Sequence, residues 1–154
     1  MNTIDKALGF RALHTRPGVF VIANAWDAGS ARILAGLGFE ALATSSGACA
    51  GTLGRRDGRV TRDEALAHAR AIVQAVDLPV SADLENGFGD APDMAAQTIR
   101  LAAEVGLVGA SIEDFSGDAA RPIYDHALAV ERVQAAAEAA RALPFPFMLT
   151  ARSE

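Results

Sequence analysis

The sequence predicts an α/β fold, a partial (β/α)8 TIM barrel with about five βα units present. Three observations predict it. Short continuous apolar runs alternate with amphipathic helical patterns, which is typical of parallel strands covered by helices. Connections from helix to strand are short, whereas those from strand to helix are longer. Residue types capable of chemistry follow the strand ends, as at the C-terminal face of a (β/α) barrel.

Length and composition indicate a single domain over residues 1–154. The chain is 51% hydrophobic, which suffices for a sizeable core. Its net charge of −5 argues against a nucleic-acid partner, and its apolar runs are too short for a membrane span. The single cysteine, Cys49, excludes an internal disulfide and fits a reducing compartment, so we expect a cytoplasmic protein with Cys49 as a small buried residue.

The elements follow from local patterns. A loose apolar stripe predicts a leading helix over 2–14, and Thr61 with Glu64 has the spacing of a capping box that begins a later helix. Residues 45–60 read as a long polar loop. The expected strands are 19–23, 41–44, 79–83, 108–112 and 147–151. The other expected helices are 28–37, 90–104 and about 126–143.

Five strands do not close a barrel of this kind, which needs eight and typically ~250 residues. The domain is therefore expected to be incomplete at its C-terminus. We expect residues 1–154 alone to be poorly stable and to associate through the open sheet edges. A longer form that continues past Glu154, assembled as a homo-oligomer, is the expected active species.

The most informative stretch is Ala82 to Gly89, which leaves the third expected strand. Asp83 and Glu85 stand two residues apart, so both can face one point if the backbone is extended there. Such a pair is costly unless a proton or a cation lies between the two acids. A hard cation such as Mg²⁺ suits these ligands. The alternative is that both acids belong to a helix start beside a solvent-exposed loop.

Five strand-end segments occur in the order found in a known family. They are Asn24-Ala25-Trp26-Asp27, Thr44-Ser45-Ser46-Gly47, Ala82 to Gly89, Ser111-Ile112-Glu113-Asp114 and Thr150-Ala151-Arg152. Together they resemble the isocitrate lyase and phosphoenolpyruvate mutase superfamily, from about Pro17 to the end of the chain. The third and fourth segments are the specific ones.

The resemblance implies a role for each matching residue. Asp83 would bind Mg²⁺ (or Mn²⁺) directly, and waters would link the ion to Glu85 and Glu113. The turn of Ser45, Ser46 and Gly47 would receive the substrate carboxylate, and Arg152 would pair with the same 2-oxo acid. Asp57 would be a catalytic acid on a mobile loop. Two alternatives stay open: Arg152 could simply pair with Glu85 or Glu154, and the two serines could be plain turn residues.

The loop after the fourth strand departs from the family. Lyases of isocitrate and methylisocitrate carry a K-[KR]-C-G-H segment there, but Phe115 to Pro122 contains no cysteine, lysine or histidine. The mutase pattern of lysine and asparagine is also absent. The expected activity is therefore that of a C–C bond lyase, decarboxylase or hydrolase. Its expected substrate is an oxaloacetate-like or phosphonopyruvate-like 2-oxo acid that reacts through a metal-stabilised enolate.

Two other functions compete with this expectation. The chain could be a non-catalytic fragment of such a barrel, because the strands can fold while the site stays incomplete. It could also be a transferase like ketopantoate hydroxymethyltransferase, which shares the barrel and the Mg²⁺-bound 2-oxo acid. The transferase would need a folate site, and nothing in the sequence indicates one.

Overall fold

Five parallel strands form one sheet in the order β1-β2-β3-β4-β5 in the computed structural model, which describes all residues 1–154. The strands are β1 Ile22–Asn24, β2 Ala41–Ala43, β3 Val80–Asp83, β4 Gly109–Glu113 and β5 Met148–Arg152. The helices are α1 Thr3–Thr15, α2 Ala28–Gly36, α3 Ser46–Thr52, α4 Arg62–Ala75, α5 Pro92–Glu104 and α6 His126–Arg141. None of these helices is long and apolar enough to cross a membrane.

The strand order distinguishes a barrel from a doubly wound sheet. Each strand pairs with the next one in the sequence, and the order never reverses. A doubly wound sheet has a switch point at which the order reverses. The predicted fold class, a partial (β/α)8 barrel of five strands, is therefore confirmed.

One expected strand boundary and one expected loop were wrong. The first strand begins at Ile22 rather than Val19, whose side chain is 93% exposed and contributes nothing to the core. The expected loop over 45–60 contains a helix, α3, whose start is capped by the Ser45 side chain accepting from the Ala48 amide. The capping box of Thr61 and Glu64 is confirmed at the start of α4.

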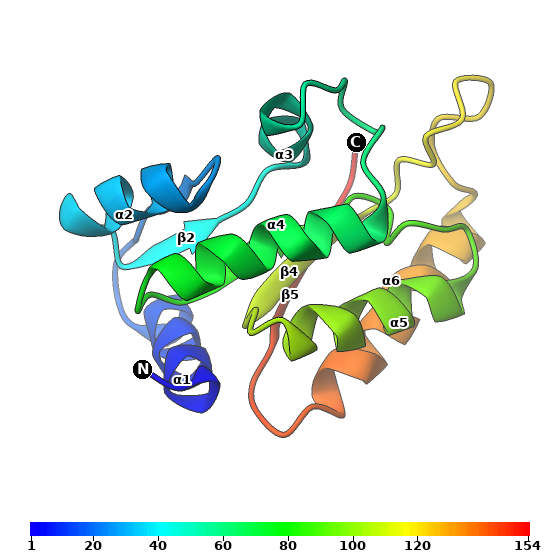
Figure 1. The fold of residues 1–154 in the computed structure, drawn as a ribbon. Coiled ribbons are helices and arrows are strands. Elements are labelled where there is room, and N and C mark those ends of the chain that lie inside the picture. Colours follow the sequence, from blue (N-terminus) through cyan, green and yellow to red (C-terminus); the bar gives the residue numbers. More distant parts are fainter.

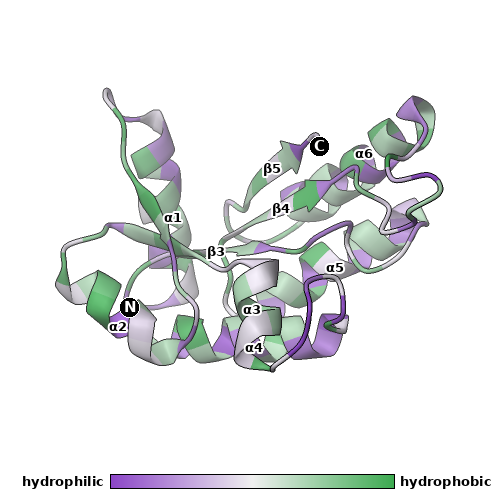
Figure 2. Cartoon of the chain, turned by 90° about the horizontal axis from the view of Figure 1, so that it is seen from above, coloured by the Kyte–Doolittle hydropathy of each residue, from purple (hydrophilic) through white to green (hydrophobic).

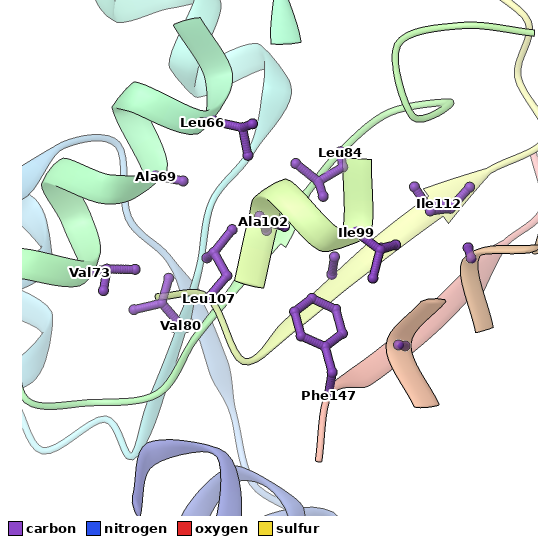
Figure 3. Close-up of a cluster of buried hydrophobic side chains, with 14 of the residues drawn as sticks. Leu66, Ala69, Val73, Val80, Leu84, Ile99, Ala102, Leu107, Ile112 and Phe147 are labelled. Atoms are coloured by element: carbon purple, nitrogen blue, oxygen red, sulfur yellow. The ribbon is translucent and has the colours of Figure 1, made fainter. Parts of the chain in front are cut away.

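The main core lies between one face of the sheet and the helices that cover it. Figure 3 shows side chains of α4, α5, β3 and β4 gathered in one cluster, which Leu107 and Phe147 join. Val80 and Ala82 of β3 and Ala110 and Ile112 of β4 are all nearly inaccessible to solvent. These alternate positions share one face of their strands, so their neighbours in sequence face the other way. Those neighbours are polar: Ser81, Asp83, Ser111 and Glu113.

Helix α1 packs at the end of the sheet where the strands begin. Phe10 of α1 is buried with Ala41 and Val108, next to the starts of β2 and β4. A Cβ added to Gly109 would lie 2.8 Å from the Phe10 ring, so glycine is required for this close approach. Figure 1 shows α1 at one end of the molecule, with α3 and the C-terminus at the other. The end carrying α3 is therefore free for a site.

Candidate functional site

A cavity of about 510 Å³ lies at the carboxyl ends of the strands. Every predicted site residue except Glu85 lines it. The lining residues are Asn24, Ser45, Ser46, Gly47, Asp57, Asp83, Glu113, Phe115, Arg152 and Glu154. They come from the ends of β1, β3, β4 and β5, from the α3 region and from the segment that joins α3 to α4. That joining segment is mostly purple, and hence hydrophilic, in Figure 2. A single apolar side chain, Phe115, completes this polar site.

Asp83, the last residue of β3, is held by two backbone amides. Its Oδ1 accepts from the Glu85 N–H at 3.1 Å, and its Oδ2 accepts from the Ser46 N–H at 3.1 Å. Its own amide donates to the Thr44 hydroxyl at 3.1 Å. The carboxylate is only 16% exposed, so these bonds fix its orientation at the mouth of the sheet.

Arg152 brings a positive charge to the acids. Glu113 and Arg152 are register partners in β4 and β5, so their side chains leave the sheet side by side. The Arg152 Nη1 lies 3.1 Å from Glu113 Oε2 and 3.6 Å from Asp83 Oδ1. Its Nη2 lies 2.5 Å from Glu154 Oε1. Arg152 therefore contacts two predicted metal-site acids as well as Glu154, the alternative partner expected from the sequence.

Asp57 reaches the cavity from the segment between α3 and α4. The Ser46 hydroxyl donates to its Oδ2 at 3.4 Å, and the same oxygen lies 3.4 Å from where a Cβ on Gly47 would be. A Cβ at position 47 would therefore be in ordinary van der Waals contact with this carboxylate. The Ser45 hydroxyl caps α3, which agrees with the structural alternative for that residue. Ser46 and Gly47, the first two residues of α3, are the part of this segment that lies next to Asp57.

Glu85 differs from the other acids in its backbone and in its pKa. Its φ of 49° lies in the left-handed region, which is sparsely populated by residues other than glycine. Burial, reinforced by the negative charges of Asp57, Asp83 and Glu113, raises its pKa to about 7. Burial also raises the pKa of Glu113, although Arg152 opposes that shift. The acids thus share one electrostatic environment that is short of positive charge.

A shared metal site of Asp83, Glu85 and Glu113 stays a prediction, although the charges of Asp83 and Glu113 both act on Glu85. No group of three histidine, cysteine, aspartate or glutamate side chains is placed to hold one metal ion together. The Arg152 guanidinium contacts Asp83 and Glu113, and Glu85 has a left-handed backbone, so the three acids do not form a closed set of ligands.

The available donors nevertheless suit a hard cation. The side chains that line the cavity offer oxygen and not sulfur or imidazole, which matches Mg²⁺ rather than Zn²⁺. Mg²⁺ usually keeps several waters and takes one or two carboxylates, so a closed set of three is not required. Asp83 as a direct ligand, with Glu85 and Glu113 reached through water, therefore fits the residues present.

Sequence reasoning left three lining residues out of the site. Asn24 ends β1, and its side-chain amide donates to the Thr44 carbonyl at 3.1 Å, which ties the first strand end to the second. Its position at a strand end was the signal that could have found it. Phe115 and Glu154 follow β4 and β5, but no local pattern separates them from ordinary loop residues.

Comparison with known proteins shows the family to which the chain belongs. The family described as phosphoenolpyruvate phosphomutase matches residues 10–154. A 2,3-dimethylmalate lyase of Eubacterium barkeri is 37% identical over 116 residues, covering 74% of this chain and 39% of the relative. A 2-methylisocitrate lyase of Escherichia coli K12 is 31% identical over 119 residues, covering 76% of this chain and 40% of the relative.

A solved structure is similar over nearly the whole chain. It is a protein of Burkholderia cenocepacia J2315, provisionally described as a lyase or mutase, with 60% sequence identity and a TM-score of 0.97. The match covers 99% of this chain and 55% of the other. The chain thus spans about half the length of that protein and 39–40% of the two curated lyases.

Proposed function

Because the chain belongs to the isocitrate lyase and phosphoenolpyruvate mutase superfamily, we propose that it contributes the site of a Mg²⁺-dependent enzyme acting on a small 2-oxo carboxylic acid. The reaction class is that of a C–C bond lyase, decarboxylase or hydrolase. One observation carries the proposal: a guanidinium and several carboxylates meet in one polar cavity at the strand ends.

The cavity supplies both charges that a 2-oxo acid site needs. Arg152 offers a planar fork of donors, which suits the substrate carboxylate. This fork contacts Glu113 and Glu154, so substrate would compete with them for it. Asp83 would hold Mg²⁺ directly, with Glu85 and Glu113 beyond its waters. The bound ion would neutralise negative charge that builds up on the keto oxygen of the substrate.

Asp57 is the residue best placed to move a proton. Its carboxylate accepts from the Ser46 hydroxyl, lines the same cavity as Asp83 and Glu113, and comes from a segment outside the sheet. An acid on such a segment can approach a substrate held by Arg152 without disturbing the strands. The Ser46 hydroxyl, within 3.4 Å of Asp57, would share the substrate carboxylate with Arg152.

A panel of 2-oxo acids assayed with and without Mg²⁺ tests the proposal. Oxaloacetate and phosphonopyruvate represent the two expected substrate types, and product is followed by mass spectrometry. The assay uses residues 1–154 and, in parallel, a longer form extended past Glu154. Turnover that requires Mg²⁺ and disappears in Asp83→Ala is the expected result. Absence of turnover and of Mg²⁺ binding in both forms would favour a non-catalytic fragment.

Isocitrate and methylisocitrate belong in the same panel as expected non-substrates. A general acid of suitable pKa is needed where carbon departs. The loop from Phe115 to Pro122 supplies no thiol for this role, although the chain is 31% identical to a 2-methylisocitrate lyase. Release of glyoxylate or pyruvate from these two substrates at an ordinary enzyme rate would contradict the proposed substrate class.

A further inference from the structure

Helix α6 carries a buried positive charge that does not reach the cavity. Arg132 is 1% exposed and forms no salt bridge. Its Nη1 donates to the Gly89 carbonyl at 2.6 Å and also to the Asp90 carbonyl, and its Nη2 donates to the Asn86 carbonyl. All three acceptors belong to the turn that follows Asp83 and Glu85. The guanidinium therefore binds the backbone of the turn that leaves the metal-site strand.

Burying the Arg132 guanidinium costs free energy, which its contacts must offset. A buried guanidinium without a carboxylate partner loses hydration that carbonyl dipoles replace only in part. Its Nε has no hydrogen-bond partner within the protein. The Tyr124 ring lies 4.3 Å from the guanidinium carbon and adds a cation–π contact.

The turn bound by Arg132 has an unusual backbone. Glu85 and Phe88 both have φ in the left-handed region, at 49° and 63°, although neither is glycine. Such residues persist only where their surroundings fix them. The Glu85 carbonyl accepts from the Glu113 amide at 3.0 Å, and the buried Gly87 carbonyl accepts from the Thr98 hydroxyl at 2.8 Å. Arg132 adds three further contacts, to the carbonyls of Asn86, Gly89 and Asp90.

Tyr124 extends the network to the loop after β4. Its hydroxyl accepts from the Asn86 side-chain amide at 2.9 Å and donates to Asp90 Oδ1 at 2.7 Å. Asn86 also donates to the Ser116 carbonyl at 3.3 Å. One set of contacts therefore joins α6, the turn after β3 and the loop after β4.

We propose that Arg132 is a positioning residue, which holds the turn of residues 85–90 so that Glu85 and Phe88 keep their left-handed backbone and the Glu85 amide stays bonded to Asp83 Oδ1. Arg132 touches neither the cavity nor a metal-site side chain, and it acts through the backbone of the turn. The expected effect of Arg132 on metal affinity rests on the proposed function. Its expected effect on the stability of the turn is independent of that function.

Lys6 provides a matched control. It is also buried, at 6% exposure, and its ammonium donates to two carbonyls, those of Val76 at 2.8 Å and Val73 at 3.4 Å. These carbonyls belong to the end of α4, away from the turn. Arg132→Met and Lys6→Met each remove one buried charge and its carbonyl bonds while keeping an apolar stem. Comparing them separates positioning from a general loss of stability.

Two measurements are made on residues 1–154. Hydrogen exchange is followed at the Gly87 and Phe88 amides relative to the Ala110 amide in the centre of the sheet. Mn²⁺ affinity is followed by calorimetry. In Arg132→Met we expect at least ~10-fold faster relative exchange in the turn and a 10–100-fold weaker Mn²⁺ affinity, the usual range for outer-shell partners. In Lys6→Met both quantities should stay within about 2-fold of the wild type.

The outcomes separate the two proposals. Equal relative exchange of the turn in Arg132→Met and Lys6→Met would overturn the positioning role. Faster exchange with unchanged Mn²⁺ affinity would overturn its link to the site. Absence of Mn²⁺ binding both in wild-type residues 1–154 and in the form extended past Glu154 would contradict the proposed function instead, and the exchange comparison would still decide the role of Arg132. If Arg132→Met does not fold, Arg132→Lys and Tyr124→Phe decide, and wild-type exchange of the turn in both would overturn the proposal.

Discussion

The centre of the sheet and its two edges are built differently, although both contribute to the site. In β3 and β4, Val80, Ala110 and Ile112 are at most 1% exposed, and helices cover them. At the edges, Val21 beside β1 is 65% exposed, and the last three residues of β5 are all exposed. Asp83 and Glu113 thus stand on the packed centre, whereas Arg152 stands on an open edge. The acids have a rigid support, and the cation that faces them does not.

The largest effect expected from this difference is on stability. Ile112→Ala removes a fully buried side chain from the centre and should lower the free energy of unfolding by about 2–5 kcal/mol. Val21→Ala at the edge should change it by less than about 0.5 kcal/mol. Urea denaturation of the two variants measures both. Similar losses would mean that the edge is covered in solution and that the comparison fails.

The next largest effect is on ligand binding, where we expect Asp83 to act on the metal and Arg152 on the substrate carboxylate. Asp83→Ala should weaken Mn²⁺ binding by at least about 100-fold while the fold persists, because several clustered carboxylates remain and their repulsion falls. Arg152→Ala should weaken pyruvate binding by about 10–100-fold, the usual cost of a charged hydrogen bond. It should leave Mn²⁺ affinity within about 10-fold. Calorimetry with each ligand measures the split, and equal losses of both ligands in both variants would contradict the assigned roles.

The structure of the central strands could be predicted from the sequence, whereas that of the turn after β3 could not. The apolar runs at 79–83 and 108–112 predict two strands with acids at their ends, so Asp83 and Glu113 could be placed at the same end of the sheet. The left-handed Glu85 could not be predicted, because its conformation depends on partners in β4, α5 and α6. Arg132 escaped notice for the same reason, since its partners are backbone carbonyls more than 40 residues away.

Local propensity explains another omission. Helix α3 contains Gly47 and Gly51, which disfavour helix, and its Ser45 cap resembles an ordinary turn signal. Arg152 was assigned by resemblance to a substrate role. Its contacts with Glu113 and Asp83 depend on strand register, which the sequence of a five-residue strand does not fix.

A smaller effect concerns pH. Glu85 has a folded-state pKa of about 7, above its usual value of 4.5, so the folded chain binds more protons than the unfolded chain between these values. Stability of the metal-free chain should therefore fall as pH rises from about 4.5 to about 7. Glu85→Gln should weaken this dependence, leaving the part that Glu113 contributes, and should gain about 1–2 kcal/mol at pH 7, after allowance for partial solvent screening. Thermal unfolding across this pH range provides the measurement, and a parallel pH profile in both proteins would contradict the assignment.

The smallest change in stability, but a clear change in association, is expected at the open edge. Strand β1 pairs only with β2, and β5 pairs only with β4, so each leaves one row of backbone groups unpaired. Exposed apolar edges of this kind favour pairing with another chain, and a lysine on the edge opposes it. Val21→Lys should therefore lower the sedimentation-average mass at high protein concentration, while unfolding free energy changes by less than about 0.5 kcal/mol. Val130→Lys, on the half-exposed face of α6, is the control for added charge away from β1. A wild-type chain that stays monomeric at all concentrations, with a sharp thermal transition, would show that the five-stranded sheet tolerates its open edges.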